Sequence, residues 1–347
     1  MNNSTHETAP LLPATNHVVH DEGESGRSGF HPRHFLSVLW RSSSVASMLV
    51  NVLWPFVPVA VALQFFPGQH LWKFATAYVA VVPSANLLGF AGQEFARKMP
   101  KVAGILIETT FGSIIEIILF VVLISKHSED NDLVPIIQAA ILGSILTNLL
   151  LCLGLCFFAG GLRQSSQRFH AIVSEVGTGL LLVAAFGLLI PSAFYSALKS
   201  ETVPDILASA ERFTREKLKQ DVLRVSHATS VALMVAFVLY IWFQARSQHS
   251  IFDEVIEMDE HRDADRATDM QKPKFTMTET VVALAISLAS VTLLLVFLVE
   301  EIEHVVESGV PDQFLGLILL PLVEKAAEHL TAIDEAWGKS PQIRDLT

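Results

Sequence analysis

Long apolar segments without charge constrain the fold of this 347-residue chain more than any other feature. Residues 44–66 and 133–160 contain no Asp, Glu, Lys or Arg. A helix of roughly 20 residues crosses the ~30 Å hydrocarbon core of a bilayer, so each of these runs is long enough to span it. Only 17% of all residues are charged, against about 25% in soluble domains. These features exclude a soluble enzyme and predict an all-α integral membrane protein surrounded by the lipid bilayer.

Hydropathy over windows of about 19 residues predicts eight transmembrane helices. They are residues 44–66, 71–94, 102–125, 133–160, 170–196, 225–245, 277–299 and 313–337. Between two of them, residues 197–224 mix acids with bases and are expected to form an amphipathic loop. The net charge of −11 argues against a nucleic-acid partner, which would need a basic surface.

Lys and Arg in the short connections predict the orientation of the chain. They concentrate in residues 95–101, 161–169 and 246–276, which should therefore face the cytosol. Residues 126–132 and 300–312 are acidic and should face a lumen or the exterior. Both termini are then expected to be cytosolic.

An acidic run lies within the long cytosolic connection. Residues 253–269 hold eight acids, of which the first five are Asp253, Glu254, Glu257, Asp259 and Glu260. Two interpretations stay open. The run is either a solvated acidic loop or an acidic helix that concentrates divalent cations at a cytosolic entrance.

Two carboxyl groups at membrane depth form the first candidate site, in the predicted span 102–125. Glu108, Gly112 and Glu116 are spaced by four residues and share one side of a helix, with Ser113 beside them. Ionisable residues are costly inside a membrane, so they usually mark function or a buried pair. The alternative is two protonated carboxyls in ordinary helix–helix hydrogen bonds. Gly112 would let a neighbouring backbone approach or let the helix expose its carbonyl groups.

A second ionisable group lies in the last predicted span. Glu324 and Glu328 share a helix face, Lys325 can reach Glu328, and His329 follows directly. A partly self-neutralising pair is the competing interpretation. A zinc site is not expected, because the segment holds a single His and lacks the His-Glu-x-x-His pattern.

The two groups appear in segments of opposite predicted orientation. Gly104 precedes Glu116 by twelve residues, and Gly316 precedes Glu328 by twelve. Similar segments that cross the membrane in opposite directions indicate an inverted repeat, whose substrate site lies where the repeats meet at mid-membrane. Carboxylates and carbonyls suit a hard divalent cation such as Ca²⁺. Carboxylates can also exchange that cation for protons, which gives antiport a physical basis.

Other polar groups in the spans are secondary candidates. Gln138, Ser144 and Asn148 in the fourth span offer uncharged oxygen ligands, or they only join helices by hydrogen bonds. Glu94 and Glu175 are proton-path or gating candidates, or satisfied carboxyls at the membrane interface.

From about residue 50 onward, the chain resembles the calcium/proton exchanger family of the calcium/cation antiporter superfamily, especially its fungal vacuolar members. The resemblance is strongest over residues 101–160 and 313–333. Gly112, Ser113 and Glu116 fall on the family's first motif, Gly-Asn-Ala-x-Glu. The segment Glu-Lys-Ala-Ala-Glu-His, which ends at His329, falls on the second motif, Gly-Asn-Ala-Ala-Glu-His.

The resemblance implies a sodium/calcium-exchanger-like bundle of inverted repeats. Glu116 and Glu328 would be the central carboxylates that bind the cation and protons. The further ligand candidates are Gly112, Ser113, Glu108, Gln138, Ser144, Asn148 and Glu324. The proton or gating candidates are Glu94, Glu175, Lys325 and His329. Residues 253–269 would be the family's acidic cytosolic helix, collecting the cation for transport.

The expected domains follow the same resemblance. They are a disordered cytosolic tail (1–43), an extra N-terminal transmembrane helix (44–66), a first repeat (71–245), an acidic loop or helix (246–276), a partial second repeat (277–337) and a polar tail (338–347).

Three departures from the family pattern set limits on this expectation. The motif Asn is replaced by Ser113 in the first repeat and by Lys325 in the second. Family members have about eleven spans, so a chain that ends at Thr347 predicts an incomplete second repeat. A completing subunit or a homo-oligomer would then supply the missing helices.

The expected function is a cation/proton antiporter that moves Ca²⁺, or Mn²⁺, from the cytosol into a vacuole in exchange for H⁺. Glu7, Leu11 and Leu12 match an acidic dileucine sorting signal, in agreement with a vacuolar membrane. No cofactor is expected beyond the transported ions. The alternative is a non-transporting regulatory or assembly paralogue whose site is closed by Lys325. A membrane enzyme is not expected, because no Ser/His/Asp order, His-rich cluster or nucleotide loop is present.

Overall fold

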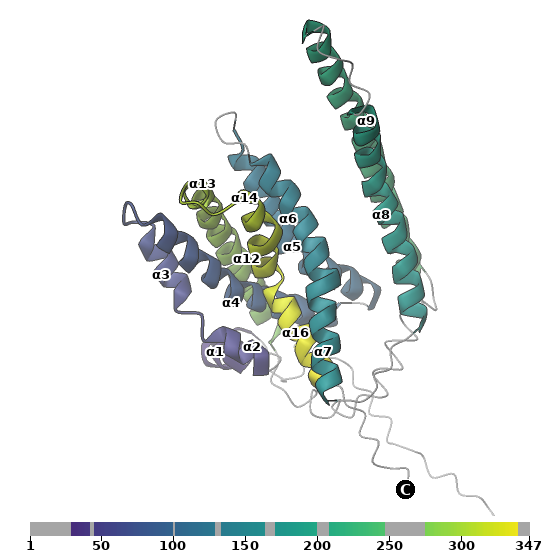
Figure 1. The fold of residues 1–347 in the computed structure, drawn as a ribbon. Coiled ribbons are helices and arrows are strands. Elements are labelled where there is room, and N and C mark those ends of the chain that lie inside the picture. Colours follow the sequence, from purple (N-terminus) through teal and green to yellow (C-terminus); the bar gives the residue numbers. More distant parts are fainter. Residues whose placement is uncertain are drawn as a thin grey trace, which may run out of the picture. The chain divides into compact units, whose positions relative to one another are not determined.

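Every regular element in the described part of the chain is a helix, as the computed structural model shows (Figure 1). The described residues are 29–41, 45–99, 101–128, 133–163, 171–199, 208–246 and 275–338. The predicted all-α class is confirmed. The dileucine pattern and the acidic run 253–269 lie outside the described residues.

The helices up to residue 246 are α1 (Pro32–Arg41), α2 (Val45–Asn51), α3 (Phe56–Leu63), α4 (His70–Arg97), α5 (Lys101–Lys126), α6 (Val134–Leu146), the π-helical segment η1 (Thr147–Cys152), α7 (Leu153–Arg163), α8 (Ala171–Lys199) and α9 (Ala208–Arg246). Those after it are α12 (Met277–Glu300), α13 (Ile302–Glu307), α14 (Asp312–Phe314), the π-helical segment η2 (Leu315–Leu319), α15 (Leu320–Glu324) and α16 (Ala326–Gly338).

The chain divides into two compact units. The first comprises residues 1–156 and 270–336, and the second comprises residues 157–269 and 337–347. In the second unit, α8 and α9 pack along one another as an antiparallel pair (Figure 1). Gly187 allows the close approach, because a β-carbon there would lie 2.7 Å from the side chain of Leu233.

Five helical segments of the described chain are long and apolar enough to cross a membrane. They are His70–Ala96, Val134–Arg163, Gly177–Ser196, Gln220–Tyr240 and Met277–Glu307. Each of them overlaps one of the eight predicted spans. The predicted span 102–125 is also a single helix, α5.

Two sequence expectations are corrected. The predicted span 44–66 is two short helices, α2 and α3, separated by a turn at residues 52–55. Pro55 accounts for the break, because proline disfavours helical geometry in the residue before it. The predicted loop 197–224 is helical from Ala208, and α9 continues without interruption into the predicted span. Residues 208–224 are rich in Ala, Glu, Lys, Leu and Arg, which favour helix.

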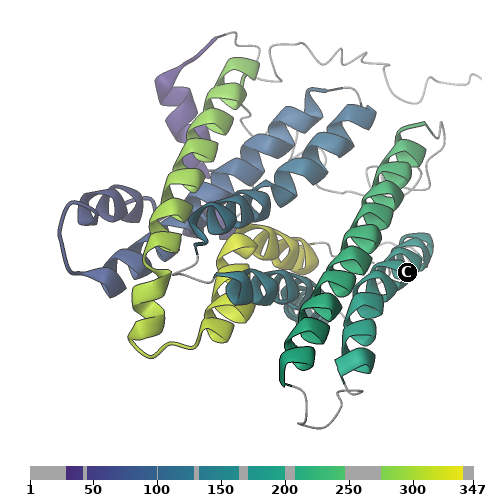
Figure 2. The same ribbon diagram turned by 90° about the horizontal axis from the view of Figure 1, so that it is seen from above.

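The core of the first unit is built around α4, α5 and α12. Helix α12 runs along α4 and also packs on α5, as Figures 1 and 2 show. A capping box starts α12: the Thr276 hydroxyl accepts a hydrogen bond from the Glu279 amide, and the Glu279 carboxylate accepts one from the Thr276 amide. Buried residues then recur every three or four positions along α12, so one face of the helix is committed to the core.

Helix α6 and the π-helical segment η2 cross at two glycines. A β-carbon on Gly143 would collide with the Leu317 carbonyl group, and one on Gly316 would lie 2.6 Å from the Ala139 β-carbon. Small residues let helix backbones approach this closely. The contact fixes the start of the last helical segment against α6, and this segment leads directly into the candidate site.

Candidate functional site

The last helical segment is interrupted inside the predicted motif. Helix α15 ends at Glu324, Lys325 adopts φ −98° and ψ 3°, and α16 begins at Ala326. The Lys325 amide still donates to the Pro321 carbonyl oxygen at 3.1 Å, and the His329 amide donates to the Lys325 carbonyl oxygen at 2.9 Å. The helix is thus interrupted at Lys325, while the amide and the carbonyl group of this residue are both hydrogen-bonded.

The Lys325 side chain joins the two motif helices. Its Nζ donates a hydrogen bond to the Gly112 carbonyl oxygen on α5 at 2.9 Å. The same atom lies 3.3 Å from Glu328 Oε2 and 3.8 Å from Glu116 Oε2. Only 7% of the Lys325 side chain is exposed. A backbone carbonyl and two carboxylates from helices far apart in sequence thus surround one buried positive charge.

These ligand types are the ones that hard cations prefer. Ca²⁺ binds carboxylate and carbonyl oxygens, with several such ligands around each ion. In this structure the Lys325 ammonium occupies that oxygen environment, so the lysine supplies internally the charge that a cation would supply from outside. Any metal ion binding between Glu116 and Glu328 must compete with this ammonium group.

Gly112 leaves the space in which these groups meet. A β-carbon added to Gly112 would lie 3.5 Å from Glu328 Oε1, at ordinary contact distance. A larger side chain would fill the space between α5 and α16. The glycine therefore offers its carbonyl oxygen to the site while adding no side chain of its own.

Glu324 is a buried carboxyl next to this group. It is 2% exposed, and neither carboxylate oxygen has a hydrogen-bond partner among the described residues. The charged groups that act on it are Glu116, Lys325 and Glu328. A buried polar group without a partner is costly. Both Glu324 oxygens are consequently available to a cation or a proton that enters the site.

A pocket of about 230 Å³ opens next to the carboxyl groups. Helix α4 contributes one wall, α5 a second, and α15 and α16 a third. The lining residues are Ala85, Asn86, Gly89, Phe90, Gln93, Phe111, Ile115, Glu324, Ala327, Glu328 and Ala332. The pocket is thus mostly apolar with two carboxyl groups in its wall.

A hydrogen bond ties the fourth predicted span to α16. His329 Nε2 lies 3.0 Å from Asn148 Oδ1 in the π-helical segment η1. Ser144, one turn earlier on α6, is buried. These two predicted oxygen donors therefore lie on the helix that packs against the last segment, with Asn148 held by His329.

Several residues predicted for the site lie elsewhere in the structure or have side chains outside the described residues. Gln138 is exposed on α6, and no contact among the described residues joins it to Glu116 or Glu328. Glu94 is buried on α4 and pairs with Lys98 at 3.5 Å. Ser113 is half-buried on α5. The side chains of Glu108 and Glu175 lie outside the described residues, as do those of Asp253, Glu254, Glu257, Asp259 and Glu260.

Two polar residues of the pocket wall, both amides, are absent from the sequence predictions. Asn86 and Gln93 line the pocket from α4. Asn86 also donates from Nδ2 to Asn51 Oδ1 on α2 at 3.3 Å. The sequence could have indicated both residues as candidates for the site. They are uncharged amides inside the predicted span 71–94, and polar residues in transmembrane helices usually face the bundle interior.

Comparison with known proteins gives a consistent set of similarities. The model of the family described as sodium/calcium exchanger protein matches residues 69–246. The chain is 32% identical over 290 residues to vacuolar cation/proton exchanger 2 of Oryza sativa subsp. japonica, which covers 82% of this chain and 61% of that protein. It is 29% identical over 331 residues to the vacuolar calcium ion transporter of Schizosaccharomyces pombe, covering 94% of this chain and 71% of that protein.

A solved structure shares the fold. The structure of native YfkE superposes with a TM-score of 0.59 at 23% sequence identity, covering 84% of this chain and 72% of that chain. The chain spans about three fifths of the length of the plant relatives it matches, with 61%, 62% and 60% of three of them covered.

Proposed function

Because the chain belongs to the sodium/calcium exchanger protein family, we propose that it is a cation/proton antiporter that moves Ca²⁺ from the cytosol across a vacuolar membrane in exchange for H⁺. The names of its relatives, vacuolar cation/proton exchanger and vacuolar calcium ion transporter, agree with this assignment. The observation that carries it is the meeting of Glu116, Glu328 and the Gly112 carbonyl group around one positive charge.

The mechanism follows from the chemistry of the carboxyl groups. When Glu116 and Glu328 are ionised, they and the Gly112 carbonyl oxygen form an oxygen-rich site for a divalent cation. When protons bind both carboxyls, the negative charge is lost and the cation leaves. Binding that alternates in this way couples the movement of protons in one direction to the movement of Ca²⁺ in the other.

Lys325 sets the resting state in this proposal. With no metal ion bound, its ammonium pairs with both carboxylates and offsets one of their two negative charges. Ca²⁺ would displace the ammonium from Glu328, and Glu324 is the neighbouring carboxyl available to receive it. Entry of the cation at Glu328 therefore requires the Lys325 ammonium to move to another carboxylate within the protein.

Transport by reconstituted protein tests the proposal. We expect the full chain in liposomes with an acidic interior to take up radiolabelled Ca²⁺, and Glu116→Gln and Glu328→Gln each to abolish uptake. Glu300→Gln is the matched control, because Glu300 is a 43% exposed carboxylate paired with Lys126 outside the site. Full uptake in both site variants would remove the carboxylate-exchange mechanism. Competition by Mn²⁺ in the same assay determines whether that ion shares the site.

A second candidate function is favoured by the same lysine. If the ammonium is never displaced, the site is closed, and the protein is a non-transporting regulatory or assembly paralogue. The buried position of Lys325 and its three oxygen contacts support this alternative. It predicts no proton-driven uptake by the wild-type chain and uptake after Lys325→Ser, whereas the antiporter predicts uptake by both.

A further inference from the structure

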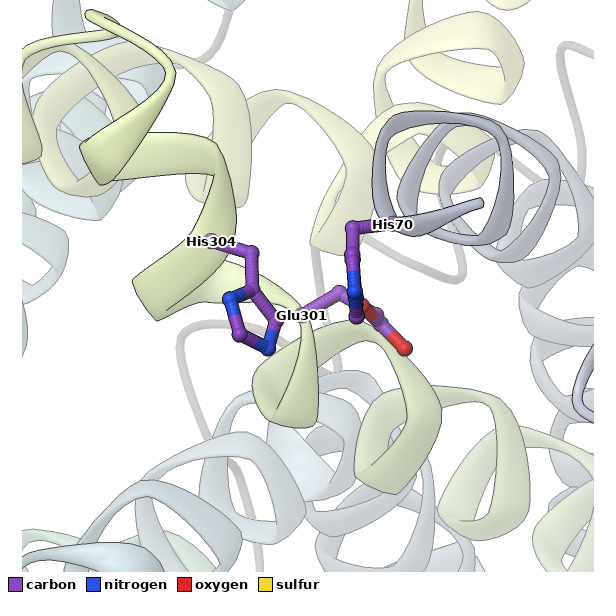
Figure 3. A group of neighbouring side chains, drawn as sticks. All are labelled: His70, Glu301 and His304. Atoms are coloured by element: carbon purple, nitrogen blue, oxygen red, sulfur yellow. The ribbon is translucent and has the colours of Figure 1, made fainter. Parts of the chain in front are cut away.

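Three potential metal ligands meet at one end of the first unit, away from the pocket described above. His70 is the first residue of α4, Glu301 lies between α12 and α13, and His304 is on α13. Figure 3 shows the three side chains gathered at one place, and one ligand atom from each lies within 4.8 Å of the others. Residues more than 230 positions apart in sequence are thus brought together, since the His70 and Glu301 side chains are in contact with a separation of 231.

The distances between these groups are short. His70 Nδ1 lies 2.6 Å from Glu301 Oε2, and the ring centroids of His70 and His304 are 3.8 Å apart. Glu301 is buried, His70 is half-buried and His304 is exposed. The carboxylate is therefore fixed in the protein interior, whereas both imidazoles can be reached from solution.

We propose that His70, Glu301 and His304 form a binding site for a divalent transition-metal ion of the Zn²⁺ class. Imidazole nitrogens select such metals over Ca²⁺ and Mg²⁺, which prefer oxygen ligands. Two histidines and one glutamate are a recurrent zinc ligand set, with water in the fourth position. The site is separate in residues and in chemistry from the carboxylates Glu116 and Glu328, and the proposal does not depend on the proposed function.

The ligand atoms need only small movements to coordinate one ion. Zn²⁺ lies about 2.0–2.2 Å from nitrogen and oxygen ligands, so tetrahedral ligands are about 3.4 Å from one another. The His70–Glu301 pair must open from its hydrogen-bonded distance of 2.6 Å. The remaining atoms must close from separations of up to 4.8 Å. The two histidines are the accessible members of the group, so their side chains are the ones that would rotate on metal binding.

Lys73 supports the carboxylate without occupying the ligand position. Its Nζ lies 3.5 Å from Glu301 Oε1, whereas His70 faces the other oxygen, Oε2. The two oxygens of Glu301 are thus divided between a charge partner and the proposed metal. A second group that holds a ligand in place is the usual arrangement around protein metal sites. His304 Nδ1 also lies 3.5 Å from Glu307 Oε2 within α13.

A bound metal would clamp the beginning of α4 to the end of α12. These two helices pack along one another, and α4 continues into the wall of the pocket. The distribution of Lys and Arg in the sequence predicts that this end of the helices faces the lumen. A metal ion in that compartment would therefore reach the site without crossing the membrane.

Metal titration of the purified full chain in detergent tests the proposal. We expect Co²⁺, a spectroscopic substitute for Zn²⁺, to give saturable visible absorption, and Zn²⁺ to compete for the same site. Zn²⁺ should also raise the midpoint temperature of unfolding. His70→Gln and His304→Gln should each lower the affinity by at least about 10- to 100-fold, the loss that even outer partners of a metal site cause.

Control variants separate this site from the rest of the molecule. His227→Gln changes an exposed histidine on α9 of the second unit and should leave the affinity unchanged. The double variant Glu116→Gln with Glu328→Gln should also retain the Co²⁺ signal. Because His304 is exposed, His304→Gln should keep the unfolding midpoint measured without metal. The proposal would be overturned if both histidine variants bound Co²⁺ as tightly as the wild type, or if the wild type showed no saturable binding. The cluster would then be only a histidine–carboxylate ion pair.

Discussion

The two motif helices of the first unit correspond in sequence position but differ in what they contribute. Aligned on Glu116 and Glu328, the paired positions are Gly104 and Gly316, Gly112 and Glu324, and Ser113 and Lys325. The first helix, α5, is continuous, whereas the second is broken at Lys325. Lys325 of the second helix donates its hydrogen bond to Gly112 of the first. The two helices are therefore complementary rather than equivalent.

The glycines twelve residues before the central carboxylates behave alike in both helices. A β-carbon on Gly104 would lie 2.6 Å from the Ala96 carbonyl oxygen, and one on Gly316 would lie 2.8 Å from the Ile136 carbonyl oxygen. Each glycine thus admits the backbone of another helix. The similarity is in how the helices pack, and the difference is in the charges next to the carboxylates.

Replacing Lys325 by serine, the residue at the corresponding position of the first helix, should lower the stability most. Lys325→Ser leaves Glu116 and Glu328 without their positive partner. Loss of one member of a fully buried ion pair costs about 3–5 kcal/mol, and we expect less here because Glu328 is 44% exposed. The variant should unfold at a lower temperature in the presence of a chelator and recover when Ca²⁺ is added, in a thermal unfolding assay.

An exposed pair provides the control for this substitution. Lys126→Ser removes the partner of Glu300, and both side chains are 43% exposed. Exposed pairs contribute about 0–1 kcal/mol, so this variant should unfold nearly as the wild type does, with or without Ca²⁺. Equal behaviour of Lys325→Ser and Lys126→Ser would mean that the lysine does not balance the site.

Substituting Gly104 or Gly316 by alanine should lower the free energy of unfolding by an intermediate amount. Gly104→Ala and Gly316→Ala each place a β-carbon against a neighbouring backbone. Overpacking of this kind costs about 1–3 kcal/mol, which chemical denaturation would measure as a lower free energy of unfolding. Gly154→Ala is the control, because among the described residues no atom of another helix lies within 4 Å of its added β-carbon. A loss confined to one of the two variants would contradict the shared packing role.

Among the substitutions in the two motif helices, Glu324→Gln should have the smallest effect on stability. The amide keeps the shape of the carboxyl group, and substitutions that conserve shape in a core usually cost less than about 1.5 kcal/mol. Since Glu324 is the carboxyl proposed to receive the displaced Lys325 ammonium, we expect Ca²⁺ uptake to fall severalfold without being abolished. Complete loss of uptake, as expected for Glu116→Gln, would instead make Glu324 a third central carboxylate.

Helices could be predicted from the sequence where local composition decides them. The predicted spans 71–94, 102–125 and 277–299 differ by at most three residues at either end from α4, α5 and α12. The predicted helix boundaries were wrong where an apolar segment is not one continuous helix and where a charged segment is helical. Residues 44–66 are apolar but interrupted near Pro55, and residues 208–224 are charged but helical. Hydropathy measures preference for lipid, and helix formation depends on backbone conformation as well.

The sequence was enough to predict the charged residues of the candidate site and a contact within one helix, but not the contacts between helices. The spacing of Lys325 and Glu328 predicts the contact seen at 3.3 Å, because neighbours three apart face each other on a helix. The hydrogen bond from Lys325 to Gly112 joins residues 213 positions apart, and no local pattern contains it. Within the described residues, neither Glu324 carboxylate oxygen has a hydrogen-bond partner, and this too depends on how the helices pack, as does the pocket wall formed by α4.

The sequence by itself determined that this is a helical membrane protein, and it predicted carboxylates within the spans. Length and polarity of each segment control its transfer into lipid, and both are local properties. Only the tertiary structure decided which charges share one environment. Lys325 lies between two carboxylates, and His70 meets Glu301 and His304, because packing α4, α5 and α12 together fixes distances between residues that the chain itself leaves far apart.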